Sequence, residues 1–249
     1  MTGPSTVTQA VLGPLLGQPH LPRLTYYDAA GNRTELSTAS LENWSAKVAG
    51  LLLDELGAQP GDLVRIDLPP GWLHLPILLG AWWAGLTVTA ADRSDAVAAF
   101  VAGGADAAAD EVFVVGDHPL GAPAEHIAAH QYDAGTAIRP QADRFSPRPG
   151  STAESTALAD PAATVGEIGL AVRTPGRPSG ARVLSAESWR LPDPGLAVLL
   201  APLAGGGSLV QLHPDLAADE SAVARIVVAE HISHAAGPGV AGRAADWPL

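Results

Sequence analysis

The first third of the chain alternates between strand-like and helix-like patterns. The stretch RLTYYD (23–28) is rich in β-forming residues, and the turn AAGNR followed by TELS predicts a β-hairpin. A helix is expected next, capped by one of the hydroxyl residues between 37 and 40 and ended by Gly57. Its apolar residues fall on one face: Leu41, Trp44, Val48, Leu51 and Leu52.

The same alternation continues to residue 117. After the turn PGD (60–62), LVRIDLP (63–69) predicts a strand, and the apolar run 71–85 predicts a helix buried between layers. LTVTA (86–90) predicts another strand, SDAVAAFVAGG (94–104) a short capped helix, and DEVFVVGD (110–117) a strand. This βαβ spacing predicts an α/β fold with layered, mostly parallel sheets and flanking helices.

The pattern stops and then resumes. Residues 137–160 are rich in Pro, Ser and Thr, and they predict a long surface loop or linker. EIGLAVRT (167–174) predicts a strand, 194–212 a helix, a glycine turn and a strand, and 219–236 a last amphipathic helix with a short strand. We therefore expect an N-terminal tail (1–20), a first α/β portion (21–136), the linker (137–160) and a second α/β portion (161–249).

Composition narrows the function classes. The 249 residues carry a formal net charge of −12, which repels nucleic acids and anionic membrane surfaces. There is no cysteine, so thiolate chemistry and Cys-ligated metals are excluded. The N-terminus lacks the basic start of a signal peptide, and no apolar run reaches the roughly 20 residues that span a bilayer. We expect a cytoplasmic protein that binds neither nucleic acid nor membrane.

Few motifs suggest chemistry. His126 and His130, four residues apart with Glu125 and Asp133 nearby, are weak metal-ligand candidates on a predicted helix face, and His231 and His234 rate no higher. Gly205–Gly207 is either an anion-holding backbone nest or, more simply, a tight helix-to-strand connection. Trp72, Trp82 and Trp83 favour core packing, with Trp72 or His74 as an alternative pocket lining. Motifs of serine hydrolases, zinc proteases and dinucleotide-binding proteins are lacking.

Three stretches resemble, in order, the N-terminal half of adenylate-forming enzymes, the superfamily of acyl-CoA synthetases, luciferases and peptide-synthetase adenylation domains. Residues 24–88 resemble its opening hairpin, first helix, PGD turn, strand and second helix. RTPGRPSGARVLS (173–185) resembles its glycine-rich phosphate loop, and LLAPLAGGGSLVQL (199–212) resembles the helix and strand that follow. AEHISHAAGPG (229–239) matches the strand that approaches the substrate pocket. The resemblance implies an α/β fold of the acyl-activating type.

The loop departs from the family pattern. Alignment on Gly176, Arg177 and Gly180 places Ser179 where the family has a lysine, and Pro175 has no N–H to offer a phosphate. Two readings stay open. Either Arg173, Thr174, Gly176, Arg177, Ser179 and Gly180 form a degenerate phosphate loop, with Arg173, Arg177 and Arg182 supplying charge, or the segment is an ordinary connection.

The resemblance therefore implies a protein that lacks autonomous catalysis. The sequence ends before the family's later motifs and its mobile C-terminal domain, and Lys47, the single lysine, lies in an early helix. We expect a non-catalytic binding or interaction module, or, alternatively, one component of a split acyl-activating enzyme. An acyl or small-hydrophobe carrier is a third, weaker reading. No cofactor is required; weak ATP or AMP binding, a nucleotide or acyl ligand, and a second copy or another protein as partner are the associated expectations.

Overall fold

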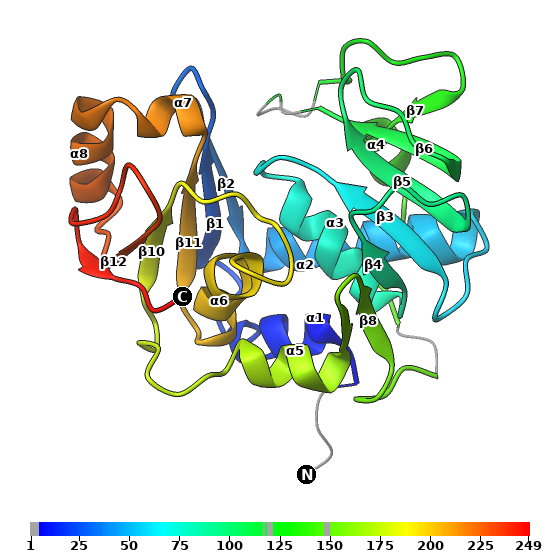
Figure 1. The fold of residues 1–249 in the computed structure, drawn as a ribbon, viewed down its shortest axis with the longest axis horizontal. Coiled ribbons are helices and arrows are strands. Elements are labelled where there is room, and N and C mark those ends of the chain that lie inside the picture. Colours follow the sequence, from blue (N-terminus) through cyan, green and yellow to red (C-terminus); the bar gives the residue numbers. More distant parts are fainter. Residues whose placement is uncertain (1–4, 117, 119–121, 147–149) are drawn as a thin grey trace. The chain divides into compact units, whose positions relative to one another are not determined.

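The computed structural model describes residues 5–116, 118, 122–146 and 150–249 (Figure 1). The chain forms two compact units that interleave along the sequence. Unit 1 comprises Met1–Gln9, Glu42–Pro69 and Leu73–Gly169, and unit 2 comprises Ala10–Leu41, Pro70–Trp72 and Leu170–Leu249. The expected division into consecutive segments at 20, 136 and 160 stays a prediction. The α/β fold class itself is confirmed.

Unit 1 is built on a seven-stranded sheet of order β7-β6-β5-β3-β4-β8-β9. Neighbouring strands are parallel except the final β8–β9 pair. The strands are β3 (Leu63–Asp67), β4 (Thr87–Thr89), β5 (Ala96–Ala102), β6 (Ala109–Val115), β7 (Gln131–Asp133), β8 (Thr156–Ala159) and β9 (Ala162–Thr164). The chain moves from β3 to β4 on one side and then returns to β5 on the other. The strand order therefore reverses between β3 and β5.

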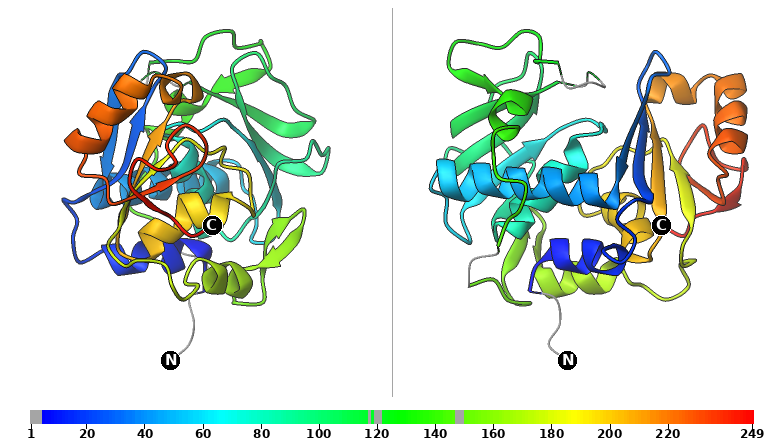
Figure 2. Two further views of the ribbon diagram at one scale, coloured as in Figure 1. Left: turned by 60° about the vertical axis from the view of Figure 1, so that its left-hand side comes forward. Right: turned by 180° about the vertical axis from the view of Figure 1, so that it is seen from behind.

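Helices pack closely in this unit. α2 (Thr38–Gly50), which continues as a π-helical turn at Leu51–Glu55, and α3 (His74–Trp83) meet at Gly80; the right panel of Figure 2 shows α2 lengthwise. A Cβ on Gly80 would lie 2.5 Å from the Val48 side chain and 2.7 Å from the Ser45 carbonyl, so only glycine permits this contact. α3 packs in turn on β3 and β4, and α4 (Ala134–Ile138) packs on β6 and β7.

Unit 2 contains a six-stranded sheet of order β13-β12-β10-β11-β1-β2. All pairs are parallel except the β1–β2 hairpin. The strands are β1 (Pro22–Tyr27), β2 (Arg33–Ser37), β10 (Arg182–Ser185), β11 (Ser208–Leu212), β12 (His234–Ala236) and β13 (Ala245–Asp246). The helices are the end of α1 (Val7–Leu12), the 3-10 turn Gly13–Leu15, a π-helical turn at Leu196–Leu200 that runs into α6 (Ala201–Ala204), α7 (Pro214–Ala217) and α8 (Glu220–Ala229).

One face of the unit 2 sheet carries α7 and α8. Leu184, Val210 and Leu212 point from the strands into a buried cluster that also contains Val223 and Ile226 of α8. Because side chains on a strand alternate between faces, Arg182 and Ser208 lie on this same face, nearer the amino ends of β10 and β11.

Two predicted elements are wrong. Residues 94–104 are not a helix but contain β5, which pairs with β3 and β6 and is buried along most of its length. Tertiary pairing overrides the helix preference of its four alanines. Residues 167–174 are not a strand, because α5 (Val165–Ala171) covers most of them. Thr164 and Glu167 cap it reciprocally through backbone N–H groups, a capping box that the sequence displayed.

Two segments read as irregular are partly ordered. The expected N-terminal tail contains α1, in which Val7, Ala10 and Val11 are fully buried. The expected loop 137–160 begins at the end of α4 and contains β8. The hairpin at 23–37, the helices at 38–50 and 74–83, and the strands at 63–67, 87–89 and 109–115 are confirmed. So are the helix, turn and strand within 194–212 and the final helix with its short strand.

Candidate functional site

The loop 173–180 links α5 to β10 and is mostly exposed. Gly176 (φ +96°) and Gly180 (φ +68°) adopt the left-handed backbone that glycine tolerates. The two loop arginines bond to carbonyl oxygens: Arg173 Nη2 donates to Ala10 (3.3 Å), and Arg177 donates to Ala171 (2.7 Å) and Pro248 (3.0 Å). Thr174 Oγ1 donates to Ala171 (2.8 Å). These contacts hold the loop to its own unit.

Ser179 also makes a local contact. Its Oγ donates to the Gly205 carbonyl at 3.0 Å, and the N–H of Gly180 donates to the same oxygen at 2.9 Å. The structure thus brings Ser179 and Gly180 beside the 205–207 glycines, while Arg173 and Arg177 extend to other parts of the unit. Whether these residues act as a phosphate loop stays a prediction.

Gly205–Gly207 forms the tight connection that the sequence favoured. The N–H of Gly206 donates to Leu203 and that of Gly207 to Pro202, with Gly206 at φ +80°, which is the Schellman arrangement that ends a helix. The N–H of Gly205 donates to Ala201. All three N–H groups are therefore used by the helix end, and the anion-nest alternative is wrong.

A groove of about 470 Å³ lies beside this connection; we call it the arginine groove. It opens on the α8 face of the sheet, toward the amino ends of β1, β10 and β11. Its polar lining comprises Gln18, Arg23, Arg33, Glu35, Arg182, Ser208, Glu230 and His231, and its remaining lining comprises Leu21, Pro22, Gly180, Gly206, Gly207 and Ala229. Of these residues, Arg182, His231 and the three glycines had been singled out from the sequence.

Glu230 organises one side of the arginine groove. Its carboxylate accepts hydrogen bonds from Tyr27 Oη (2.7 Å), from Arg33 Nε (2.7 Å) and from Arg182 Nη2, and its side chain is 8% exposed. Burial raises the pKa of Glu230, but the bonds from Arg33, Tyr27 and Arg182 outweigh burial and lower it to about 2. Burial and the neighbouring Glu230 raise the pKa of Tyr27 to about 12. The carboxylate is therefore permanently ionised near neutral pH.

Arg23 occupies the other side and is only 3% exposed. Its Nη1 donates to the carbonyls of Gly206 (2.9 Å) and Gly207 (3.0 Å), its Nε to Thr38 Oγ1 (3.0 Å), and its Nη2 to Gln18 Oε1 (2.6 Å). Burial lowers the pKa of Arg23. Within the described part of the chain, no carboxylate forms an ion pair with this guanidinium.

Sequence reasoning missed Arg23, Arg33 and Glu230. One signal was available, because Glu230 ends a helix, where a carboxylate opposes the helix dipole and needs a cationic partner. A second signal was the place of Arg23 in a strand that also contains Leu24 and Tyr26. An arginine in such a strand is rarely buried unless its charge has partners.

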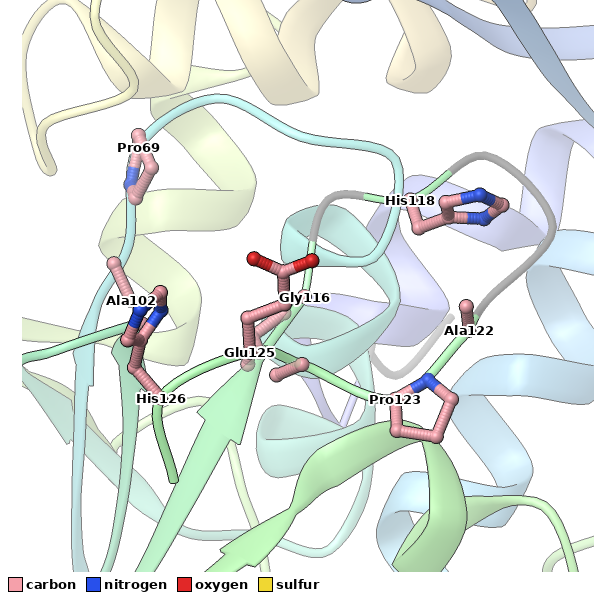
Figure 3. Close-up of a pocket in the computed structure, with 11 residues that line it drawn as sticks. Pro69, Ala102, Gly116, His118, Ala122, Pro123, Glu125 and His126 are labelled. Carbon is pink, nitrogen blue, oxygen red and sulfur yellow. The ribbon is translucent and has the colours of Figure 1, made fainter. Parts of the chain in front are cut away.

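A second hollow, of about 360 Å³, belongs to unit 1 (Figure 3). It lies beyond the carboxyl ends of β3, β5 and β6, next to Pro69, Ala102 and Gly116. This is where the strand order reverses, the usual ligand position of an open α/β sheet. Figure 3 shows the Glu125 carboxylate between His126 and His118.

The weak metal pair His126 and His130 is not on a helix, because residues 122–130 are irregular. The four-residue spacing therefore does not align the two rings. His126 has φ +59° and lines the unit 1 hollow, whereas Nε2 of His130 lies 3.1 Å from Asp106. Across the residues that the structure covers, no cluster of three or more His, Cys, Asp or Glu side chains is arranged to hold a metal. His231 lines the arginine groove, and His234 stacks edge-on against Trp247.

Other residues singled out from the sequence have structural roles. Lys47 bonds to the Arg139 and Gln141 carbonyls and pairs with Asp143 (2.7 Å), which fastens the 139–143 segment to α2. Trp72 and Trp82 are buried, and Trp82 donates to Ala157 at 2.9 Å. His74 is 4% exposed; its Nδ1 donates to Pro69 (3.2 Å), and burial lowers its pKa to about 4. Among the described helices, none is long and apolar enough to cross a bilayer.

Solved structures with a similar fold include three CoA ligases. An acyl-CoA synthetase from Brucella canis superposes with a TM-score of 0.72 and 16% identity, over 92% of this chain and 47% of that protein. The anthranilate CoA ligase AuaEII, solved with anthranoyl-AMP, superposes with a TM-score of 0.69 and 14% sequence identity, over 92% of this chain and 49% of that protein. Acetoacetyl-CoA synthetase from Streptomyces lividans superposes with a TM-score of 0.68 and 17% sequence identity, over 92% of this chain and 42% of that protein. The chain thus spans about half the length of these enzymes.

A relative of similar length exists in Mycobacterium tuberculosis (strain ATCC 25618 / H37Rv). This TIGR03089 family protein is 39% identical over 235 residues, which cover 86% of this chain and 93% of that protein. No model of a known protein family matches the chain. The protein is a member of the TIGR03089 family, and its fold is that of adenylate-forming acyl-CoA and aryl-CoA ligases.

Proposed function

We propose that this protein is a non-catalytic relative of the adenylate-forming enzymes that acts as a binding or interaction module. The observation that carries the proposal is Ser179, which stands at the lysine position of the phosphate loop and gives its hydroxyl to the Gly205 carbonyl. Adenylate formation needs fixed positive charge at the phosphates, because negative charge is redistributed there in the transition state. A serine hydroxyl bonded to the backbone supplies none.

The neighbouring cations support the same proposal. Arg173 and Arg177 are bound to carbonyls of the same unit, and turning either one toward a triphosphate would break those bonds. Lys47 makes three contacts within unit 1. The loop as folded therefore fits a triphosphate poorly, so we propose at most weak ATP or AMP binding and no required cofactor.

ATP–pyrophosphate exchange tests the proposal. Purified protein, incubated with ATP, Mg²⁺ and a panel of aliphatic and aromatic carboxylic acids, is expected to give exchange at the level of the protein-free control. Exchange above that level by the wild-type chain alone, lost on loop substitution, would overturn the proposal.

The companion variant is Ser179→Lys, which restores the family's loop residue. We expect it to raise ATP affinity in calorimetry while exchange stays at background, because one lysine does not rebuild the rest of the loop. Strong exchange by Ser179→Lys would show a nearly intact catalytic site and would contradict the assignment. Exchange by the wild type only after a second protein is added would replace the module with a split enzyme.

A further inference from the structure

The residues that line the arginine groove carry more positive than negative charge. Its lining contains three guanidinium groups, Arg23, Arg33 and Arg182, against two carboxylates, Glu35 and Glu230. Arg33 and Arg182 share Glu230, and Arg33 also bonds to Glu35. The remaining positive charge is that of Arg23.

Arg23 is held without a countercharge in a buried position. Its four assigned hydrogen bonds go to neutral acceptors, two carbonyls, one hydroxyl and one amide. A guanidinium has five N–H donors, so one donor on Nη2 has no acceptor among the residues that the structure describes. Buried charges in proteins are ordinarily paired, because desolvation disfavours an isolated ion.

We propose that the arginine groove binds a singly charged organic anion, a carboxylate or a phosphodiester, whose oxyanion pairs with Arg23. This proposal rests on the proposed function in treating the protein as a binding module, and it adds the site and the chemical class of the ligand. The oxyanion site is centred on Arg23, and the 173–180 loop contributes only Gly180 to the groove lining.

The remaining lining fits the rest of such a ligand. Leu21, Pro22 and Ala229 supply an apolar wall, and Leu21 is 46% exposed despite its size. A volume of about 470 Å³ exceeds what a bare inorganic ion needs and suits a molecule with an apolar body. The single excess charge matches one anionic group better than a dianion, because a dianion would leave its second charge facing Glu35 and Glu230.

A purely structural role for Arg23 is the competing explanation. Its two bonds to Gly206 and Gly207 place a cation at the negative end of the helix that finishes at Ala204, which by itself stabilises that helix. This role predicts loss of stability on substitution but no saturable anion binding. The experiment must therefore measure binding.

The test is calorimetric titration of the intact chain at low ionic strength with sodium benzoate, dimethyl phosphate and inorganic phosphate as separate probes. We expect saturable one-site binding of benzoate or dimethyl phosphate, weaker binding of inorganic phosphate, and loss of affinity as salt is added. The two organic arms distinguish the carboxylate from the phosphodiester.

Two substitutions with opposite expected effects identify the site. Arg23→Gln is expected to weaken binding about tenfold or more, because the cation that pairs with the anion is removed. Glu35→Gln, which changes a side chain that is 32% exposed and bonded to Arg33, is expected to tighten binding about threefold by removing a like charge. Arg93→Gln and Glu154→Gln make the same charge changes in unit 1 and should leave the affinity within about twofold.

The outcomes are decisive even when Arg23→Gln does not fold, because Glu35→Gln then carries the test. No saturable binding of any probe, or equal effects of Glu35→Gln and Glu154→Gln, overturns the anion site. Neither result bears on catalysis, which the exchange assay decides. If the protein showed exchange activity and its anion binding also responded to the substitutions as expected, the proposed function would be contradicted and the anion site would stand.

Discussion

The 173–180 loop and the arginine groove are neighbours in unit 2, yet they use arginine in different ways. In the loop, Arg173 and Arg177 donate to backbone carbonyls and tie down an exposed segment. In the groove, Arg33 and Arg182 hold a carboxylate that is 8% exposed, and Arg23 is buried with neutral acceptors only. In the account proposed above, the groove, and not the segment that resembles a phosphate loop, is the place where an anion binds.

The difference follows from burial. An exposed guanidinium is well solvated and gains little from an added anion, whereas a buried one has lost its water and gains much. A motif alignment reports which residues stand in a loop, but the energetic value of each charge depends on surroundings that come from distant strands. The groove draws its residues from β1, β2, β10, β11 and the end of α8.

The largest expected effect is loss of the groove carboxylate. Glu230→Gln should destabilise the protein by about 3 kcal/mol, because Arg182, which is only 17% exposed, loses its countercharge and the more exposed Arg33 loses one of its two carboxylate partners. Urea unfolding measures this, with Glu220→Gln on the same helix as control. Glu220 pairs with Arg243 at 3.4 Å but is 86% exposed, so its loss should cost less than about 0.5 kcal/mol. Equal effects of the two variants would show that the groove carboxylate stabilises the protein no more than an exposed ion pair does.

The contribution of Glu230 should depend on pH in a defined window. Its pKa is about 2 in the folded protein and near 4.5 when unfolded, so the unfolded state takes up the proton first as pH falls. The stabilisation is fully present above about pH 4.5 and is lost progressively toward about pH 2. Unfolding midpoints of the wild type and Glu230→Gln should therefore converge across this range. A gap that stays constant down to pH 2 would mean that the carboxylate is not held by Arg33 and Arg182.

Replacing a glycine by alanine should destabilise the protein more in the groove wall than in the 173–180 loop. Gly207→Ala would place a Cβ 2.1 Å from the Ala181 carbonyl oxygen, and a shift of packed backbone should cost about 2 kcal/mol or more. Gly176→Ala meets no atom within 4 Å and only strains the φ of +96°, for about 1 kcal/mol. Thermal unfolding of both variants measures the difference. A larger loss for Gly176→Ala would show that the loop, not the wall, is tightly packed.

The smallest expected effect concerns Ser179, the residue that aligns with the loop lysine of the adenylate-forming enzymes. Ser179→Ala removes one exposed hydrogen bond to Gly205 and should cost about 0.5 kcal/mol, with no change in anion affinity. Thermal unfolding and the benzoate titration together provide the measurement. A marked loss of anion binding would place the ligand on the loop.

Much of the fold could be predicted from the sequence because its signals are local. The hairpin at AAGNR, the apolar helix around Leu75–Leu79 and the glycine turn at 205–207 each follow from residues close in the chain. The failures at 94–104 and 167–174 have different causes. β5 is a strand because β3 and β6 flank it, which no local pattern reveals, whereas the capping box of α5 was visible and was overlooked.

The site was less predictable than the fold. Glu230 lies 48 residues from Arg182 and 197 from Arg33 along the chain, so only the sheet order brings the three together. The sequence could indicate that a carboxylate at a helix end needs a partner, but not which arginine provides it. Conversely, the phosphate-loop resemblance was readable from sequence, while the carbonyl partners of its arginines required the folded chain.

The most direct test of this account compares anion affinity in Arg23→Gln and Arg177→Gln, one cation from each region. Calorimetric titration with benzoate should show affinity reduced about tenfold or more in Arg23→Gln, because the groove loses its buried, uncompensated cation, and unchanged in Arg177→Gln. The opposite pattern, binding lost in Arg177→Gln and retained in a folded Arg23→Gln, would place the ligand on the loop and contradict the account.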